Sequence, residues 1–559
     1  MTGPLAVAGP ERRVQRLSDG CRLVADIWRP EAPGPWPVLL MRQPYGRAIA
    51  STVVFAHPAW YAAQGYIVCI QDVRGSGESD GDFALFEAEA ADGAEAVDWA
   101  ADLPGSSGRV GMYGFSYQGV TQLLALAGRL DRDGDPGPVA ALSPAMIGWT
   151  IADDWAWEGG AFLLAANLAW GAQMAALQAR RAGDAEAHAA LGAVARGLPA
   201  HGPIPALPKA MDRHRRYGHY TDWLENPPGA AYWHRIAPAA ALGDRRPAVP
   251  MLHVGGWADT MLTGTLAAQA AMTASAAPQP MVIGPWGHIP WGRRVGALDM
   301  GPEAASPIDQ LQVAFFDRWL KDDDQSAAIT DIRLFDIGIK RWRAFDSWPA
   351  PSPTTLFPVA DGLAAAGSTG RLEDAPPGDG AASDRIVHDP WRPAPALGGH
   401  AGAPGGFQNR AAIDDRSDVA VYTGDPLILP MTLAGTVTLG LDIAADAETF
   451  DVSAVLSHVT PDGEAWTLTQ GYRRVPAGHA GPVTVPMRAV CATLPASARL
   501  RLSLAGAAFP AYTVNPGVAI PDAEARQLDQ RVVTLALRPG PASRLDLPVV
   551  APEAAGSGA

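Results

Sequence analysis

Short apolar runs bounded by turn residues recur through the first part of the chain. They lie at residues 37–41, 66–71 and 109–113, and the pattern resumes much later at 249–254 and 280–283. Such runs are typical of strands buried on both faces. A strand pair at 14–30 precedes them, and helical patterns at 88–101 and 120–129 lie between and after the first three. Alternating strands and helices predict a parallel sheet with right-handed crossovers.

The stretch from about residue 146 to 240 follows a different pattern. It is rich in Ala, Leu, Trp and Arg at helical spacing, as in residues 162–181 and 185–196. We expect a helical insertion over the carboxyl ends of the strands, which is where open α/β sheets bind ligands.

The pattern changes again near residue 355, after a helix expected at 307–321. Residues 360–383 are rich in Gly, Ala, Ser, Asp and Pro, show no periodicity, and predict a loop. The later runs are alternating or rich in β-formers: 419–422, 436–443, 450–458, 466–472, 499–504 and 531–537. Several short strands with turn signals predict a β-sandwich.

Composition narrows the class of protein. The 559 residues are 48% hydrophobic and 18% charged, as in globular proteins, and their number predicts several domains. A net charge of -15 argues against a large nucleic-acid or anionic-lipid surface and favours a small-molecule or peptide substrate. Cys21, Cys69 and Cys491 fit neither a disulfide framework nor a metal spacing. With no apolar run long enough to span a bilayer and no signal-peptide pattern, we expect a cytoplasmic protein.

The strongest chemical signal is the segment Arg-Val-Gly-Met-Tyr-Gly-Phe-Ser-Tyr-Gln-Gly at residues 109–119. A strand runs into a sharp turn with Ser116 at its apex and a helix behind it, which predicts a nucleophile elbow. One departure from the G-x-S-x-G pattern is Gln118, which displaces the second glycine to Gly119. The competing interpretation is an ordinary strand-to-helix turn with Ser116 near a helix N-cap.

An acid and a base follow Ser116 in the chain order that this arrangement requires. Asp259 comes after the strand at 249–254, and His288 comes after the strand at 280–283. Asp259 would orient the imidazole, and His288 would take the proton of Ser116 and return it to the leaving group. His253 lies within an apparent strand and is better explained as a core residue. The competing roles are loop capping for Asp259 and a plain surface position for His288.

An oxyanion needs two donors, and the chain offers two candidates. One is the backbone N–H of Tyr117, directly after the nucleophile. The His-Gly-Gly context that often supplies the second is absent after the strand at 37–41, where Tyr45 stands instead. Its phenol can donate a hydrogen bond, although an aromatic residue here can also simply pack against the turn.

These segments together resemble the family of cocaine esterase, α-amino-acid ester hydrolases, glutaryl-type β-lactam acylases and X-prolyl dipeptidyl peptidases. The residues that carry the resemblance are 114–119, the Pro-Tyr-Gly turn at 44–46, 256–259 and 284–288. The resemblance implies an α/β-hydrolase domain (1–145 and 241–354), an inserted helical cap (146–240) and a C-terminal all-β jelly roll (355–550). A disordered tail is expected at 551–559. It also implies that Tyr45 and Tyr117 form the oxyanion hole, and Gly119 is normal for the family.

The resemblance extends to the substrate pocket. Trp155 and Trp170 look like the aromatic pair that lines it in cocaine esterase, although plain core packing explains them equally well, and Met261 would face the acyl group. The α-amino-ester hydrolases carry carboxylates two and three residues after the acid, where this chain has Met261 and Leu262. Asp153, Asp154 and Glu158 could supply anionic partners, but a solvated face is the plainer expectation for them.

The sequence thus predicts a cofactor-free serine carboxylesterase that forms an acyl-enzyme on a small ester with an uncharged, aromatic or aliphatic acyl group. The alternatives are an amide-directed acylase, an X-prolyl dipeptidyl peptidase or α-amino ester hydrolase, and a catalytically silent carbohydrate-binding protein. We expect no metal, because the histidines, including His214 and His219, lack metal-ligand spacing. No nucleic-acid or membrane partner is expected, and a homo-oligomer stays open.

Overall fold

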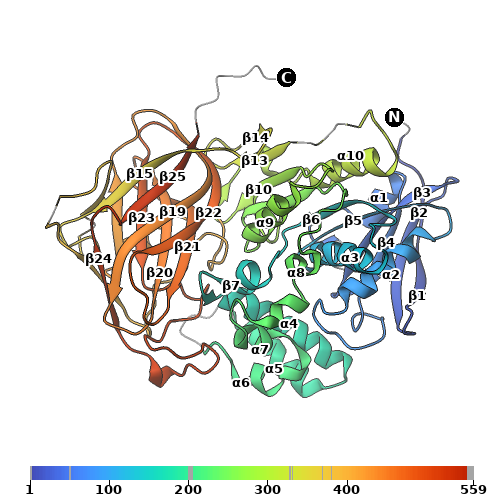
Figure 1. Ribbon diagram of the computed structural model, residues 1–559, viewed down its shortest axis with the longest axis horizontal. Coiled ribbons are helices and arrows are strands. Elements are labelled where there is room, and N and C mark those ends of the chain that lie inside the picture. The colour runs from blue at the N-terminus through green and yellow to red at the C-terminus, as the bar shows by residue number, and fades with distance from the viewer. Residues whose placement is uncertain are drawn as a thin grey trace.

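The computed structural model describes residues 3–48, 52–198, 205–326, 329, 331–367, 369–378 and 380–550. An α/β domain and an all-β domain stand side by side, and a group of helices lies against both (Figure 1). This is the fold class that the sequence predicts. The expected tail, 551–559, lies outside the described residues.

Ten described strands form the sheet of the first domain, and its central strands are parallel. Their order across the sheet is β1 (Val7–Arg16), β2 (Arg22–Pro30), β4 (Ile67–Asp72), β3 (Trp36–Gln43), β5 (Ser106–Phe115), β6 (Val139–Ala145), β9 (His253–Ala258), β10 (Met281–Gly287), β13 (Ile332–Asp336) and β14 (Arg341–Phe345). Because parallel strands end at one edge, the loops after β3, β5, β9 and β10 gather there.

Helices cover both faces of this sheet, which explains why its central strands are almost continuously apolar. Val38 and Leu40 of β3 belong to one core cluster, together with side chains of α2 (Glu89–Ala101) and α3 (Tyr117–Asp133). Leu39 and Met41 face the other way, into a cluster with side chains of α1 (Pro58–Ala63) and α10 (Ile308–Leu320). A further helix, α9 (Leu262–Met272), packs beside β9.

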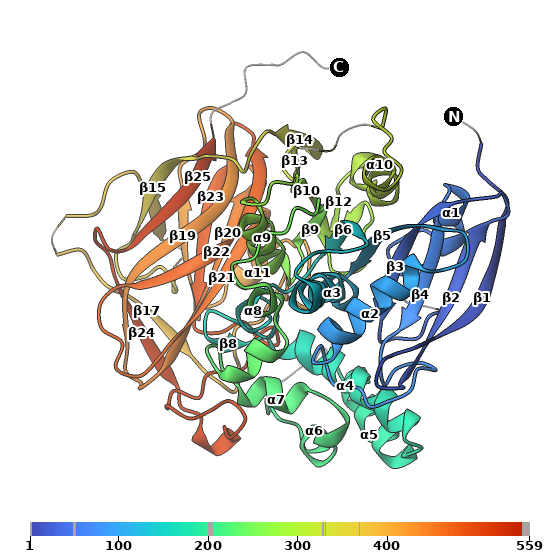
Figure 2. The same ribbon diagram turned by 45° about the vertical axis from the view of Figure 1, so that its right-hand side comes forward.

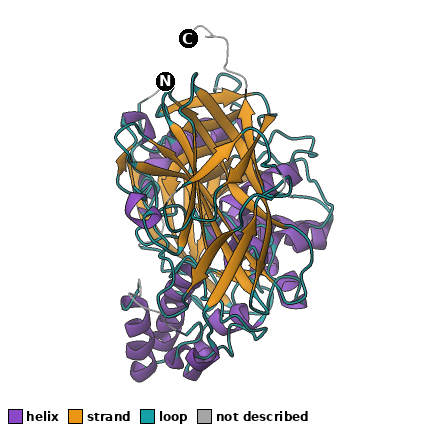
Figure 3. Cartoon of the chain, turned by 90° about the vertical axis from the view of Figure 1, so that its left-hand side faces the viewer, coloured by secondary structure: helices purple, strands orange, loops and turns teal. Residues whose placement is uncertain are grey.

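The helical insertion follows β6 and forms the lower part of the molecule in Figures 1 and 3. Its elements are a π-helical turn (Ala152–Ala156), β7 (Trp157–Glu158), β8 (Ala161–Phe162), α4 (Leu164–Arg181), α5 (Ala185–Arg196), α6 (Lys209–Arg213), α7 (Tyr220–Glu225) and α8 (Pro238–Leu242), with short 3₁₀ turns at 215–217 and 231–235. The insertion contacts both domains: Gln178 Nε2 donates to Gly75 O at 3.1 Å, and Leu164 N donates to Ala511 O at 2.8 Å. We call it the cap.

The second domain is an all-β sandwich (Figure 2). Its strands are β15 (Ser352–Val359), β16 (Gly370–Glu373), β17 (Asp384–His388), β18 (Val419–Gly424), β19 (Met431–Ala445), β20 (Phe450–Val459), β21 (Ala465–Val475), β22 (Val483–Leu494), β23 (Arg499–Ala505), β24 (Val533–Arg538) and β25 (Arg544–Val550), with one short helix, α11 (Ala411–Asp414). Buried residues alternate with exposed ones along β17 and with partly buried ones along β24, because one face of each strand packs on the core.

Two sequence-based expectations differ from the structure. The strand expected at 249–254 is displaced to β9, so Gly255 and Gly256 lie in the strand rather than in the loop after it. A Cβ at Gly256 would lie 2.3 Å from Trp286 O, so only glycine lets β9 continue against β10. The stretch 360–383 also contains strand β16, whose four residues, Gly-Arg-Leu-Glu, are too short a run to predict a strand but pair with β15 and β18.

Within the described residues, no helix is both long and apolar enough to cross a bilayer.

Candidate active site

Ser116 lies in a strained turn between β5 and α3. Its φ of 60° and ψ of -128° are rarely adopted by residues other than glycine, and its hydroxyl projects at the edge where the parallel strands end. A Cβ at Gly119 would lie 2.4 Å from Ile147 Cγ2, so the displaced glycine of the sequence pattern allows α3 to approach the end of β6. Gly114, at φ 143°, would place a Cβ 2.5 Å from that of Gln118.

Asp259 and His288 are brought together by the parallel pairing of β9 with β10. Asp259 ends the turn after β9 with its side chain fully buried, and its Oδ1 lies 2.8 Å from His288 Nδ1. The ring centroid of His288 lies 5.4 Å from that of Phe115, the residue before Ser116. Since Asp259 holds Nδ1, Nε2 is the nitrogen that remains for proton exchange with the serine.

Tyr45 reaches Ser116 from the loop after β3. Its phenol accepts a hydrogen bond from Trp170 Nε1 at 3.1 Å and also interacts with the side chain of Ser116. Burial raises the pKa of Tyr45 to about 12, and the hydrogen bonds with Trp170 and Ser116 offset only part of this effect. The phenol is therefore neutral near pH 7 and keeps its proton for donation.

Tyr117 is the first residue of α3, a position where a helix N–H has no intrahelical partner. Its side chain points into the core, and its hydroxyl donates to Glu89 Oε1 at 2.8 Å. Glu89 in turn pairs with Arg42, near the end of β3, at 2.5 Å, and both side chains are buried. This ion pair connects the loop of Tyr45 with the helix that begins at Tyr117.

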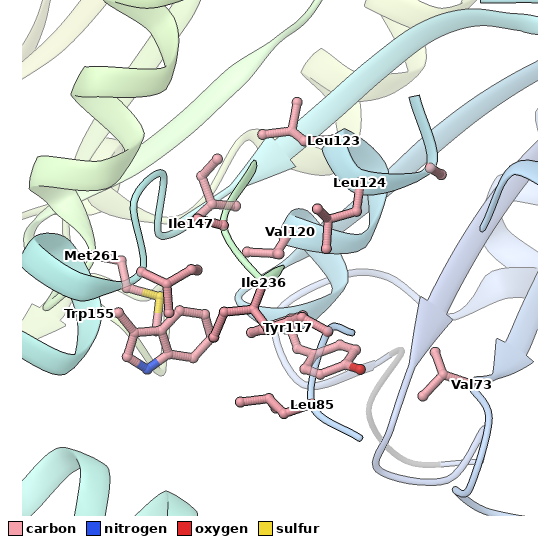
Figure 4. Close-up of a cluster of buried hydrophobic side chains, with 14 of the residues drawn as sticks. Val73, Leu85, Tyr117, Val120, Leu123, Leu124, Ile147, Trp155, Ile236 and Met261 are labelled. Carbon is pink, nitrogen blue, oxygen red and sulfur yellow. The ribbon is translucent and has the colours of Figure 1, made fainter. Parts of the chain in front are cut away.

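The predicted substrate-binding residues lie between the cap and the acid loop. The rings of Trp155 and Trp170 are 5.0 Å apart, and Trp155 and Met261 belong to the buried cluster drawn in Figure 4 with Tyr117. Sequence reasoning missed His219 and Trp223, which pack on Trp170 with ring centroids 4.5 and 5.7 Å away. Their spacing of four residues, one helical turn, is the only signal that could have indicated them.

The expectation of a solvated face for the cap carboxylates is wrong for two of the three. Asp154 is buried and accepts backbone N–H groups from residues 149, 150 and 151 at 3.0, 2.8 and 2.9 Å. Burial nevertheless raises the pKa of Asp154 to about 6. Glu158 is nearly buried because His400 and Arg488 of the all-β domain contact it, whereas Asp153 is exposed as expected.

Arg488 of β22 is a site residue that the sequence did not indicate. Its Nη1 donates to Asp259 O and its Nη2 to Thr260 O, each at 2.7 Å, while Nη2 also lies 3.0 Å from Glu158 Oε2. Burial favours a raised pKa for Glu158, but the charge of Arg488 and the contact with His400 outweigh burial and hold it well below its usual range. We call Arg488, Glu158 and His400 the junction cluster, because it joins all three parts of the chain.

Comparisons with known proteins cover both domains. Residues 19–290 match the family model of the X-Pro dipeptidyl-peptidase (S15 family), and residues 323–546 match its C-terminal non-catalytic domain. Cocaine esterase of Rhodococcus sp. (strain MB1 Bresler) is 31% identical over 535 residues, which are 89% of this chain and 91% of that protein.

Two solved structures share the fold along nearly the whole chain. An aminopeptidase from the marine sediment archaeon Thaumarchaeota archaeon has 22% identity and a TM-score of 0.79, covering 97% of this chain and 96% of the other. An α-amino acid ester hydrolase has 21% identity and a TM-score of 0.76, covering 98% and 97%.

Proposed function

The chain belongs to the family of serine hydrolases that includes the S15 X-Pro dipeptidyl-peptidases and cocaine esterase, and within it we propose a carboxylesterase for uncharged, aromatic or aliphatic acyl groups. Membership explains the resemblance seen in the sequence and makes the chain a hydrolytic enzyme. The choice of substrate class rests on the residues around the site.

The proposed reaction begins with attack of Ser116 Oγ on the ester carbonyl while His288 Nε2 takes the hydroxyl proton. Asp259 holds the imidazole through Nδ1 and stabilises its positive charge. The carbonyl oxygen becomes an oxyanion between the Tyr45 hydroxyl and the Tyr117 N–H. Collapse breaks the ester C–O bond, and His288 gives its proton to the departing alkoxide. Water then attacks the acyl-enzyme by the same steps, and Ser116 regains its proton.

The choice of an uncharged acyl group rests on one observation: the buried carboxylates near the site already have partners and are not free to bind a substrate ammonium. Two of the positions that could hold a substrate ammonium are Met261 and Leu262, which are apolar and buried. The oxygens of Asp154 already accept three backbone N–H groups, and those of Glu158 face Arg488 and His400. A charged α-amine would thus be buried without a free partner, which is costly.

A burst-phase assay with a matched pair of esters tests this proposal. The pair is p-nitrophenyl phenylacetate and the p-nitrophenyl ester of phenylglycine, which differ by one α-amino group. We expect a stoichiometric burst of nitrophenol and a higher kcat/KM with the phenylacetate. Ser116→Ala should give no burst, and His288→Gln should slow the burst strongly. The control His253→Gln changes a core histidine, and its folded fraction should show the same burst as the parent.

Either of two results would redirect the assignment. A preference for the phenylglycine ester would favour an α-amino ester hydrolase or peptidase. Turnover of neither ester, together with no labelling of Ser116 by a fluorophosphonate, would favour the silent binding protein.

A further inference from the structure

A cavity of about 390 Å³ lies beside His288, between the α/β domain and the all-β domain. The α/β domain contributes Ala258, residues 287–290 and residues 294–296, and the all-β domain contributes Gly399, His400, Gly405 and Gly406. Its size falls within the range of small-molecule sites. Trp155, Trp170 and Met261 are not among its lining residues.

The two walls of this cavity are held together by backbone contacts. Ala297 N of the α/β domain donates to Phe407 O of the all-β domain at 2.9 Å, and within the all-β wall Gly399 and Gly406 exchange a pair of N–H to O hydrogen bonds, both 2.7 Å long. A Cβ at Gly296 would lie 2.5 Å from Phe407 O, so glycine is what allows the loops of the two domains to touch. The cavity is therefore preformed by the fold.

The position of the cavity relative to His288 indicates which half of an ester it receives. In the proposed reaction the imidazole protonates the leaving oxygen, so the alcohol must depart next to the His288 ring. The predicted acyl-binding residues lie elsewhere, against the cap. Resting on the proposed function, we propose that this cavity binds the leaving group, and that Arg294 makes it selective for alcohols that carry a carboxylate.

The charge of the lining supports this selectivity. Arg294 is the one lining residue with a permanent charge, and no carboxylate lines the cavity among the described residues. Burial lowers the pKa of His400, so this second lining histidine besides His288 adds no cation near neutral pH. The neighbouring Arg293 pairs with Asp299 at 2.6 Å, whereas Arg294 has no carboxylate oxygen within 4 Å in the part of the chain that the structure describes. In a chain of net charge -15, this cation locally offsets the repulsion of an anionic alcohol.

Two esters with the same acyl group separate the leaving-group effect from the rest of catalysis. They are the phenylacetyl esters of 4-hydroxybenzoate, which is anionic, and of methyl 4-hydroxybenzoate, which is neutral. Both form the same acyl-enzyme, so recognition of the alcohol changes kcat/KM for acylation, whereas a deacylation-limited kcat is common to both. We define the selectivity as kcat/KM for the anionic ester divided by that for the neutral ester.

We expect Arg294→Gln to lower the selectivity about 5-fold and Arg294→Glu about 10-fold or more, with kcat/KM for the neutral ester nearly unchanged. The matched control is Lys340→Gln, which removes a neighbouring positive charge outside the cavity whose ammonium donates to a backbone oxygen, Asp299 O, and should leave the selectivity within about 2-fold. Added salt should lower the selectivity of the parent and not that of Arg294→Glu.

The inference is overturned if Arg294→Glu keeps the parent's selectivity, or if Lys340→Gln lowers it equally, since a general surface field would then account for it. Failure of the proposed function looks different: the parent itself would hydrolyse neither ester, which would overturn both.

Discussion

Tyr45 is a neutral phenol throughout the pH range in which a histidine base works, since its pKa is raised to about 12. Replacing it by Phe keeps the ring and removes one of the two proposed oxyanion donors. We expect Tyr45→Phe to lower kcat by about 10²–10³ with a small change in KM, because the lost bond strengthens only in the transition state. Steady-state kinetics with p-nitrophenyl phenylacetate measures this effect.

A control for this prediction is Trp170→Phe, which removes the donor to Tyr45 but leaves the phenol in place. We expect a much smaller loss of kcat from it. Equal losses in the two variants would mean that the hydrogen bond between Trp170 and the Tyr45 hydroxyl, and not donation by Tyr45 to the oxyanion, is what catalysis requires.

His219 is the residue from which we expect a strong dependence of stability on pH. It is 5% exposed, both of its ring nitrogens lack a hydrogen-bond partner among the described residues, and burial lowers its pKa to about 3. In the unfolded state the imidazole has a pKa near 6.5, so it binds a proton at pH values where the folded state leaves it neutral. The free energy of unfolding therefore falls as the pH decreases from about 6.5 toward 3. This linkage removes about 2 kcal/mol between pH 8 and pH 5.

Between pH 8 and pH 5, the free energy of unfolding should therefore fall by about 2 kcal/mol less in His219→Phe than in the parent. Urea titrations at pH 8 and pH 5 measure the difference. His479→Gln changes an exposed histidine and should behave as the parent does. A pH dependence that His219→Phe leaves unchanged would contradict the argument.

At the scale of elements, the buried pair of Arg42 and Glu89 holds β3 against α2 and, through Tyr117, against α3. Removing one partner leaves an uncompensated buried charge. We expect Arg42→Met to lower the free energy of unfolding by about 3–5 kcal/mol, and Arg42→Met with Glu89→Gln to recover part of this loss because neither charge then remains. Denaturant unfolding of the two variants tests the pair. A double variant less stable than Arg42→Met would show that the hydrogen bonds matter more than the charge.

Elements with a strong local period were the ones that the sequence could predict. The helix expected at 185–196 is α5, and the strand expected at 37–41 lies within β3. The strand expected at 66–71 differs from β4 by one residue at each end. Strand β16 was missed because it has only four residues and because one of its two partners, β18, lies far along the chain. The displacement of β9 has the same origin, since its glycines are poor strand formers until β10 lies beside them.

At the scale of the whole molecule, the junction cluster ties the acid loop to the other two parts of the chain. Arg488 holds the carbonyl oxygens of Asp259 and Thr260, and its charge lowers the pKa of the buried Glu158 carboxylate. Removing Arg488 alone therefore leaves a buried carboxylate without its partner, whereas removing both charges leaves only the lost hydrogen bonds.

We expect Arg488→Gln to lower the free energy of unfolding by about 3–5 kcal/mol, and Arg488→Gln with Glu158→Gln to recover part of this loss because neither charge then remains. Denaturant unfolding measures both variants. Arg526→Gln, which breaks an exposed ion pair of the same domain, should leave the free energy of unfolding nearly unchanged. An Arg488→Gln variant as stable as the parent would contradict the argument.

The sequence located the candidate triad and Tyr45 because each follows a recognisable strand or turn. It could not indicate Arg488, which lies 229 residues after Asp259 and shares no local pattern with it. It also misjudged Glu158, whose burial depends on His400 and Arg488. Contacts between domains leave no period in the sequence, so only the folded chain reveals them.

The clamp of Arg488 on the acid loop has a consequence for the timing of biosynthesis. A ribosome that adds 5–20 residues per second takes roughly 10–45 s to travel from Asp259 to Arg488. For most of that interval the nascent chain already carries the proposed nucleophile, acid and base, but the strand that fixes the acid loop has yet to be made. We therefore expect a nascent chain to acquire esterase activity only near the end of translation.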